Sequence, residues 1–207
     1  TRNPHVAHIA TLTMMFIDLV NSSALGERLE AEDLLEVIKQ YREFASVAIG
    51  HFGGHVARLV GDGILAYFCY PIANENDPER AVRAALEIVR GIEALETPAP
   101  MPLNVRIGIA TGRVIVSDLF AGGSADMRSI IGSAPNLAAR LQALAAPGTV
   151  VVAASTRRLL GDLFQLRDLG RHELKGIAEP VAAWAVEGIS DSESRFEAVR
   201  AAALAGL

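Results

Sequence analysis

Apolar runs and apolar stripes alternate along the first third of the chain, which indicates strands interleaved with helices. Residues 8–18 are rich in β-branched and aromatic side chains and end abruptly at Asp18, as a buried strand followed by a turn does. Between residues 32 and 49, apolar side chains recur at intervals of three and four, which predicts an amphipathic helix. Gly53 and Gly54 follow, and glycine favours the left-handed backbone that ends a helix.

A hairpin is expected next. Residues 55–60 and 64–70 form two short apolar runs that are separated only by a Gly61-Asp62-Gly63 turn. Asp-Gly is a favoured pair in tight hairpin turns because it tolerates positive φ. The pattern therefore predicts that Asp62 lies at the tip of a hairpin.

Strands and helices continue to alternate through the second half. Asp77 and Pro78 suit the N-cap and the first position of a helix, because proline at that position has no hydrogen bond to lose. The other expected elements are strands near 103–110, 129–131, 149–153, 164–168 and 181–187, and helices over 134–146 and from Ser155. Paired strands covered by helices in the order βαββαββαβ predict an α+β fold.

Composition indicates a globular protein and narrows its partners. The 207 residues are 51% hydrophobic and 21% charged, which is enough apolar surface for one well-packed domain. A net charge of -5 argues against nucleic acid as a partner, so an anionic ligand must be held by local groups or by metal. No apolar run approaches the ~18 residues of a membrane span, and Cys69 is the only cysteine. We expect a cytoplasmic protein with no membrane segment in this stretch, and Thr1 in place of Met suggests a fragment.

Two aspartates carry the candidate chemistry. Asp18 and Asp62 are each expected at a strand end beside glycine or small polar residues, where carboxylate oxygens can bind a hard cation such as Mg²⁺. The small side chains of Asn21, Ser22 and Ser23 would let backbone N–H groups reach phosphate oxygens. Taken singly, each motif has a simpler interpretation, because Asp-Gly turns are common and a strand-end aspartate is often only a cap.

Four segments in register make a stronger case than either aspartate alone. They read FIDLVNSSAL, GGHVARLVGDGILAYF, LNVRIGIATGRV and IIGSAPNLAARLQ. In this order and spacing the chain resembles the class III adenylate and guanylate cyclases over about residues 9 to 188. The resemblance implies the nucleotide cyclase fold, a ferredoxin-like βαββαβ core with additional C-terminal strands. It also implies a catalytic domain at 9–188, with an N-terminal extension at 1–8 and a C-terminal linker or helix at 189–207.

The resemblance assigns roles to matching residues. In this family two divalent ions, Mg²⁺ or Mn²⁺, activate the ribose 3′-hydroxyl and neutralise the triphosphate, so that ATP gives cyclic AMP and pyrophosphate. Asp18, Asp62 and the main-chain carbonyl of Leu19 match the metal ligands. Asn136 matches the residue that orients the ribose, and Arg140 matches the one that stabilises the α-phosphate in the transition state. Their spacing of four places both on one face of the expected helix.

Basic residues elsewhere match the substrate contacts less firmly. Arg106 and Lys175 match positions that contact the terminal phosphates, although an exposed strand arginine and a turn lysine describe them equally well. Arg58 stands where a base-reading lysine is usual, and its planar guanidinium only donates hydrogen bonds. Ser129 stands where many adenylate cyclases carry Asp or Thr, and a hydroxyl can read adenine or guanine. ATP is favoured by family frequency, while a guanylate cyclase or a catalytically degenerate, nucleotide-binding regulatory domain stays open.

Partners follow from the same resemblance. In the family, one protomer of a head-to-tail homodimer supplies the metal aspartates and the other supplies Asn136 and Arg140. The tail ESRFEAVRAAAL resembles the segment that joins some bacterial cyclase domains to a C-terminal ATPase region. The sequence contains no P-loop, HExxH or GxSxG motif, so P-loop NTPases, zinc proteases and serine hydrolases lack their signatures here.

Overall fold

The computed structural model describes residues 8–70, 72–117 and 129–190. Residues 1–7 of the predicted extension at 1–8 and residues 191–207 of the predicted C-terminal segment at 189–207 lie outside the described residues. None of the helices within the described ranges combines the length and the apolar character needed to cross a bilayer. In chain order the elements are β1 (His8–Leu19), α1 (Ser22–Arg28), α2 (Ala31–His51), β2 (His55–Val60), β3 (Gly63–Phe68), α3 (Asp77–Glu93), β4 (Val105–Ser117), β5 (Ser129–Gly132), α4 (Ser133–Leu144), β6 (Thr149–Ala153), α5 (Ala154–Leu160), β7 (Phe164–His172) and β8 (Val181–Ile189).

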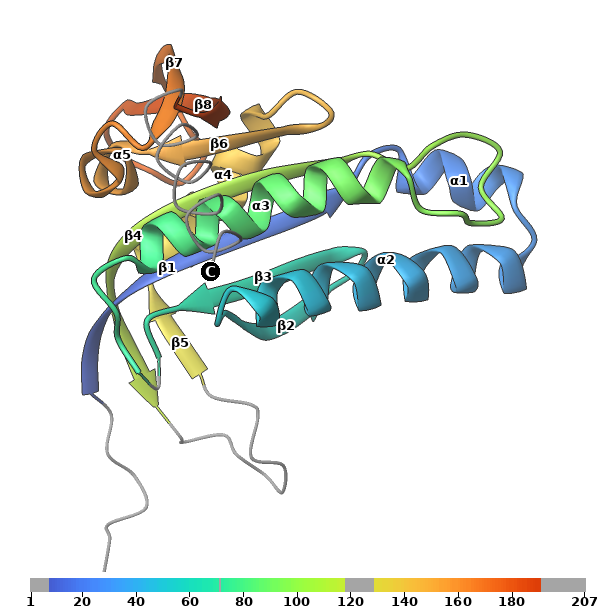
Figure 1. Ribbon diagram of the computed structural model, residues 1–207, viewed down its shortest axis with the longest axis horizontal. Coiled ribbons are helices and arrows are strands. Elements are labelled where there is room, and N and C mark those ends of the chain that lie inside the picture. The colour runs from blue at the N-terminus through green and yellow to red at the C-terminus, as the bar shows by residue number, and fades with distance from the viewer. Residues whose placement is uncertain (1–7, 71, 118–128, 191–207) are drawn as a thin grey trace, which may run out of the picture.

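One sheet forms the frame of the molecule (Figure 1). Its strand order is β2-β3-β1-β4-β6-β8-β7, and β5 pairs with β4 beside this path. The first four strands pair antiparallel and, with α2 and α3, form the βαββαβ unit of a ferredoxin-like core. β6 joins β4 in parallel, and β8 and β7 extend the sheet as an antiparallel pair. The predicted α+β class and the core with additional C-terminal strands are confirmed.

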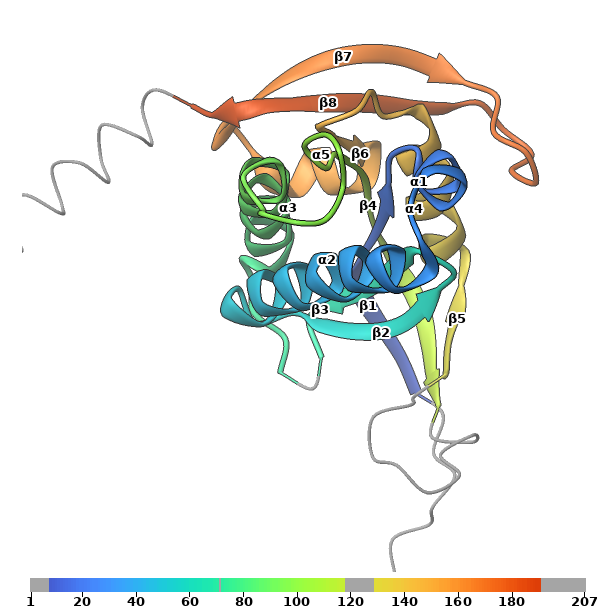
Figure 2. The same ribbon diagram turned by 90° about the vertical axis from the view of Figure 1, so that its right-hand side faces the viewer.

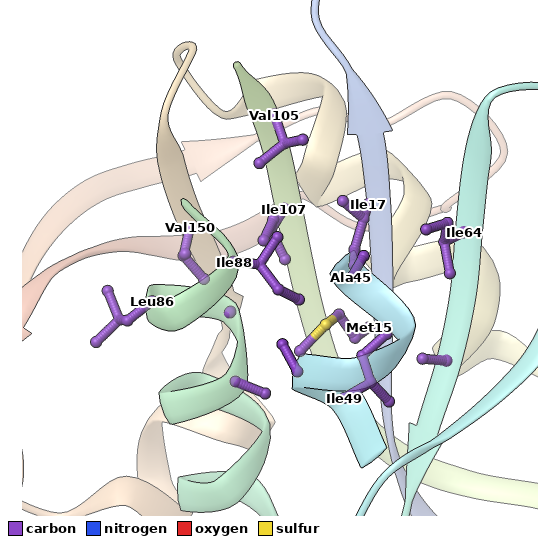
Figure 3. Close-up of a cluster of buried hydrophobic side chains, with 14 of the residues drawn as sticks. Met15, Ile17, Ala45, Ile49, Ile64, Leu86, Ile88, Val105, Ile107 and Val150 are labelled. Atoms are coloured by element: carbon purple, nitrogen blue, oxygen red, sulfur yellow. The ribbon is translucent and has the colours of Figure 1, made fainter. Parts of the chain in front are cut away.

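Helices α2 and α3 cover one face of this sheet with large aliphatic side chains (Figure 3). Alternate residues of β1, including Met15 and Ile17, point to this face and lie near Ile107 of β4. Ile49 of α2 and Ile88 of α3 pack against them from the helix side. Complete burial of each such side chain stabilises the fold by about 1.5–3 kcal/mol, so this face supplies much of the stability.

Helix α4 covers the opposite face at unusually short range. Figure 2 shows α3 and α4 on opposite sides of β1 and β4. A Cβ atom at Gly108 of β4 would lie 2.1 Å from the carbonyl oxygen of Ala138 and 2.4 Å from the amide nitrogen of Gln142. Glycine at this position therefore lets the α4 backbone lie directly against β4. The small side chains of Ala134 and Ala138 complete this close contact.

Two turns differ from the sequence prediction. Residues 19–23 were expected as a turn, but Ser22 and Ser23 already belong to α1, because Asn21 adopts a left-handed backbone (φ 58, ψ 27) and turns the chain into a helix. In the hairpin between β2 and β3 the positive φ falls on Gly61 (φ 61), not on the Asp62-Gly63 pair. Glycine at the first central position, with positive φ there alone, is the pattern of a type II′ turn.

The start of α3 is fixed by a buried carboxylate. Asn76, not Asp77 as predicted, is the N-cap, so Asp77 is the first residue of the helix. The fully buried Asp77 carboxylate accepts the backbone N–H of Asn74 at 2.6 Å and a guanidinium N–H of Arg80. A negative charge in the first turn is also favoured by the helix dipole.

Candidate functional site

Asp18 and Asp62 meet at one end of the sheet. Asp18 is the penultimate residue of β1, and Asp62 lies in the turn between β2 and β3. Antiparallel pairing aligns Ile17 with Ile64, so the end of β1 lies beside the start of β3 and its turn. Asp62 lies close enough to Asp18 for its side chain and its negative charge to raise the pKa of the Asp18 carboxyl. The structure thus brings together two aspartates that are 44 positions apart in the sequence.

Burial and repulsion make the negative charge of Asp18 unfavourable. The pKa of Asp18 is raised above its ordinary value, first because burial removes water from the carboxylate and second because Asp62 lies beside it. The positive charge of Arg106 and a hydrogen bond from Gln142 act in the opposite direction. A cation between the two carboxylates would convert their repulsion into attraction.

The donor set fits a hard divalent cation. Oδ2 of Asp62 is buried and has no hydrogen-bond partner within the part of the chain that the structure describes. A buried anionic oxygen without a partner is strongly destabilising, and carboxylates are ligands that Mg²⁺ and Mn²⁺ prefer. Among the described residues no three side chains of His, Cys, Asp or Glu gather in one place. Further ligands would therefore be other oxygen atoms, for which the carbonyl of Leu19 is the neighbouring candidate.

An arginine from α2 holds the turn that carries Asp62. The Arg42 guanidinium donates a hydrogen bond to the carbonyl oxygen of Gly61. Its neighbour Tyr41 is fully buried, and the pKa of its hydroxyl is raised by burial first and then by the negative charges of Asp18 and Asp62. The apolar stripe marks Tyr41 as a core residue, but no sequence signal connects Arg42 to the hairpin.

The turn after β1 leads directly into α1. Asn21, whose left-handed backbone is one that asparagine tolerates well, is the N-cap, and its carbonyl oxygen accepts the N–H of Leu25 at 3.0 Å. Ser22 and Ser23 begin the helix. The leading N–H groups of a helix have no partner inside it, so these residues can offer donors to an anion.

Arg106 stands directly beside Asp18. The two residues are paired across β1 and β4, so their side chains share the face covered by α4. Arg106 is half-buried, and its Nε has no hydrogen-bond partner among the described residues. The structure therefore brings this predicted phosphate-binding residue to the two carboxylates.

Asn136 and Arg140 occupy a different side of α4 from the one that touches the sheet. Asn136 is exposed and Arg140 is partly buried, with no hydrogen-bond partner for its Nε in the described part of the chain. Within that part, no hydrogen bond or ion pair joins either residue to the two aspartates of the same chain. The buried residues of α4 are Ala134, Ala138, Leu141 and Gln142.

The predicted base-reading residues lie on β2 and at the start of β5. A bulge between Val56 and Arg58 shifts the register of β2 by one residue, which places Arg58 opposite Leu65 and so on the α4 side of the sheet. Arg58 is exposed there. The backbone of Ser129 begins β5 and pairs with Ser117. No hydrogen bond between described residues links Arg58 to the aspartates.

Lys175 lies in the exposed loop between β7 and β8, where Gly176 follows with a positive φ of 83. No ion pair connects Lys175 with the aspartates in the described structure. A cavity of about 300 Å³ opens elsewhere, behind the Asn21 turn. Its lining comes from α1, from residues 100–104 and from Pro147, and it includes neither aspartate. The carboxylate pair therefore lies outside this cavity.

Gln142 is a site residue that the sequence prediction missed. Its Nε2 donates to Oδ2 of Asp18 at 3.3 Å, from a side chain that is only 6% exposed. The available signal was a polar amide on the apolar stripe of α4, four residues after Ala138. Such a residue needs a polar partner when it is buried, but the sequence does not identify that partner.

Comparison with known proteins shows which family this chain is similar to. The profile of the adenylate and guanylate cyclase catalytic domain matches residues 5–188. An uncharacterized protein of Rhizobium meliloti is 32% identical over 188 residues, which are 90% of this chain and 18% of the relative. The chain thus spans less than a fifth of that relative's length.

Two solved structures share the fold over almost their entire length. The adenylyl cyclase CyaB from P. aeruginosa superposes with a TM-score of 0.83 at 28% identity, covering 90% of this chain and 98% of that one. The guanylyl cyclase Cya2 superposes with a TM-score of 0.79 at 26% identity, covering 89% of this chain and 95% of that one.

Proposed function

The chain belongs to the family of adenylate and guanylate cyclase catalytic domains, and from that premise we propose that it converts ATP to cyclic AMP and pyrophosphate. The observation that carries this proposal is the convergence of Asp18 and Asp62. Two half-buried carboxylates beside each other are costly to a fold, and a metal site at the triphosphate would give them a function.

Asp18 and Asp62 would hold two divalent ions, Mg²⁺ or Mn²⁺, with the Leu19 carbonyl as a further ligand. Bound there, the ions would favour ionisation of the ribose 3′-hydroxyl and neutralise the charge of the triphosphate. The chain's own groups would then orient the nucleotide. Arg106, beside Asp18, would contact the terminal phosphates, and the leading N–H groups at Ser22 and Ser23 would donate to phosphate oxygens.

A second copy of the chain would complete each site. Asn136 and Arg140 lie on a side of α4 that turns away from their own aspartates, so we propose that they orient the ribose and stabilise the α-phosphate in the partner's site. Exposed apolar side chains on β2, β4 and β5 support a head-to-tail homodimer, because such side chains mark association surfaces. They are Leu59, Val60, Ile115 and Ile131, with exposures from 43% to 58%.

The proposal constrains the nucleotide base of the substrate, adenine or guanine, least. The solved relatives include an adenylyl cyclase and a guanylyl cyclase at nearly equal identity. Arg58 and Ser129, the proposed base contacts, both differ from the usual adenylate cyclase residues, and Arg58 offers donors only. A guanylate cyclase is therefore the second candidate, and a degenerate nucleotide-binding domain is the third. Lys175, in the exposed loop between β7 and β8, is proposed as a contact of the terminal phosphates.

The wider setting follows as a separate proposal. We place the catalytic domain at 9–188 in the cytoplasm, with the segment after it leading to a C-terminal ATPase or regulatory region. Limited proteolysis of the full-length protein tests this boundary, since a protected fragment that ends near 188 is expected. A protected fragment that continues well past residue 207 would contradict the proposed domain boundary at residue 188.

A nucleotide assay tests the activity directly. Purified protein is given ATP, GTP, CTP or UTP separately, each with Mn²⁺ or Mg²⁺, and the cyclic product is identified by mass spectrometry. Cyclic AMP as the main product supports the proposal, and cyclic GMP moves it to the second candidate. Nucleotide binding without any cyclic product supports the third candidate, a degenerate nucleotide-binding domain.

A mixing experiment tests the shared site. Asp62→Ala protein and Arg140→Ala protein should each be nearly inactive, because every homodimer lacks one half of both sites. A mixed dimer has one intact site, so mixing should restore activity to as much as about a quarter of the wild-type rate for random pairing. The shared-site arrangement is wrong if the mixture stays inactive while size-exclusion chromatography shows that mixed dimers form.

A further inference from the structure

Gln142 makes a contact that the proposed roles of α4 do not require. Its amide nitrogen donates to Asp18 at 3.3 Å, and its side chain is 6% exposed. The same helix carries Asn136 and Arg140, which are assigned to the partner's site. Helix α4 therefore contacts Asp18 of its own chain and also carries the two residues that are proposed to act in the partner's active site.

The helix backbone leaves little freedom at this contact. At Gly108, β4 and α4 approach so closely that a Cβ would meet the backbone of Ala138 and of Gln142 itself. Gly108 lies two residues from Arg106, which is paired with Asp18. The backbone of residue 142 and the side chain of residue 142 are thus both fixed against the strands that carry the candidate metal site.

Arg140 and Gln142 point to different sides of α4. Two residues on a helix that are two positions apart are separated by about 200° around its axis. Gln142 is on the buried side, whereas Arg140 is partly exposed and has an Nε without a hydrogen-bond partner among the described residues. A small rotation or shift of α4 at Gln142 would therefore move Arg140 on the other side of the same turn.

We propose that Gln142 is a positioning residue that fastens α4 to Asp18, so that the two half-sites of one chain, which serve two different active sites of the dimer, move as one unit. The inference rests on the proposed function for the roles of Asp18 and Arg140. It adds that Gln142 acts on both sites: on its own chain's site by orienting Asp18, and on the partner's site by fixing the helix that supplies Arg140.

A simpler alternative is that the hydrogen bond only satisfies a buried amide. Substitution separates the two, because methionine has nearly the volume of glutamine and can fill the same space without donating a hydrogen bond. Gln40→Met is the matched control. Gln40 is also partly buried on a helix and donates to a carboxylate, that of Glu36 at 2.8 Å, in a contact within α2 alone.

Binding of Mn²⁺ provides a readout that does not depend on turnover. The free ion is followed by electron paramagnetic resonance while Mn²⁺ is titrated into the protein with a non-cyclisable ATP analogue. Gln142→Met should weaken Mn²⁺ binding about 10-fold, the lower end of the effect of losing a hydrogen-bond partner of a metal ligand. Gln40→Met should bind as the wild type does. Equal affinity of Gln142→Met and wild type would overturn the proposal.

Mixed dimers separate the two effects of Gln142. In the Asp62→Ala and Arg140→Ala mixture, the one intact site takes its aspartates from the Arg140→Ala chain and its Arg140 from the Asp62→Ala chain. Gln142→Met in the chain that supplies the aspartates should raise the Mn²⁺ concentration needed for half-maximal rate about 10-fold. Gln142→Met in the chain that supplies Arg140 should lower kcat about 10-fold and leave that Mn²⁺ concentration unchanged.

The outcomes are distinguishable from failure of the proposed function. If the parent mixture makes no product, the shared site is wrong, while the Mn²⁺ titration still decides whether Gln142 supports Asp18. If the parent mixture is active and only the first placement has an effect, Gln142 does not fix α4 and the proposal is overturned. Reduced rates from both placements, with the Mn²⁺ requirement changed only by the first, support it.

Discussion

Ile17 and Asp18 are neighbours on β1, yet their side chains enter two very different environments. Ile17 points to the face covered by α2 and α3, where large aliphatic residues fill the space completely. Asp18 points to the face covered by α4, where a glycine allows the helix to approach closely and where Arg106 and Gln142 lie beside the Asp18 carboxylate. Both faces belong to the same strands, so the difference is set by side chains and not by backbone.

The contrast assigns stability and chemistry to opposite sides of one sheet. The apolar face gains free energy from every residue it buries. The α4 side instead holds Asp18, whose negative charge is opposed by burial and by the neighbouring Asp62, so that its ionisation works against folding in the absence of a cation. A well-packed apolar face thus lies behind a face that carries unfavourable charge, and substitutions on each face should have different effects on stability and activity.

The largest effect is expected for loss of one carboxylate. Asp62→Asn keeps the shape of the hairpin tip but removes a proposed metal ligand, which should lower the cyclase rate by about 10³-fold or more, because metal stabilisation of the transition state is worth several kcal/mol. The free energy of unfolding, measured by urea titration, should change by less than about 1 kcal/mol, since the turn conformation depends on Gly61.

Asp162→Asn is the matched control for that prediction. Asp162 is an exposed aspartate between α5 and β7, so both activity and stability should stay at wild-type levels. If the activity of Asp62→Asn lies within tenfold of the wild-type activity, Asp62 is not a ligand of a catalytic metal ion.

The apolar face should show the opposite signature. Ile17→Ala leaves a cavity among fully buried side chains and should lower the free energy of unfolding by about 2–5 kcal/mol. Activity per folded molecule should be retained at temperatures where the variant is native. Leu35→Ala, on an exposed position of α2 (69% exposed), should change stability by less than about 0.5 kcal/mol. A loss below about 1 kcal/mol for Ile17→Ala would contradict the assignment of stability to this face.

The two faces also differ in how much of them the sequence could predict. Apolar periodicity located the residues under α2 and α3, because burial of alternate strand positions needs no knowledge of distant partners. The end of an apolar run placed Asp18 at a strand end, and turn chemistry placed Asp62 at a hairpin tip, because both signals are local. On the α4 face the same reasoning identified single residues, such as Asn136 and Arg140, but not the residues that they contact.

Contacts between distant residues account for what the sequence could not provide. Gln142 is recognisable only as a polar residue on an apolar stripe, and its partner lies 124 positions away. The face on which Arg58 lies depends on a one-residue bulge that no composition signal marks. Arg42 donates a hydrogen bond to a carbonyl oxygen in the turn that carries Asp62, and a contact to the backbone leaves no pattern of residue types.

A smaller effect is expected where the two elements of the α4 face touch. Gly108→Ala places a Cβ 2.1 Å from the Ala138 carbonyl, so α4 must shift, at a cost of about 1–3 kcal/mol in stability. Gly188→Ala is the control, because a Cβ at that position of β8 meets no atom within 4 Å. Differential scanning calorimetry of both variants measures the difference. Equal melting temperatures would show that α4 does not depend on this close approach.

The smallest effect, and the one most specific to the carboxylate face, concerns Asp18 without metal. Its pKa is raised above the ordinary 3.8, so the folded state holds the proton more tightly than the unfolded state. As pH rises above 3.8, the unfolded carboxyl ionises first, and the folded protein loses stability until Asp18 has also ionised. Asp18→Asn carries no such charge. In EDTA at pH 7 it should therefore melt about 1–3 °C above the wild type, since the shift of a partly exposed group is worth at most about 1 kcal/mol after solvent screening.

That advantage should vanish at about pH 2.5, more than one unit below 3.8, where Asp18 is almost fully protonated in both states. It should reverse at pH 7 with excess Mn²⁺ and an ATP analogue, because only the wild type gains stability from binding. Asp162→Asn should show neither dependence. If Asp18→Asn is less stable than the wild type in EDTA at pH 7, Asp18 stabilises the fold. The assignment of stability to the apolar face and of chemistry to the α4 face would then be wrong.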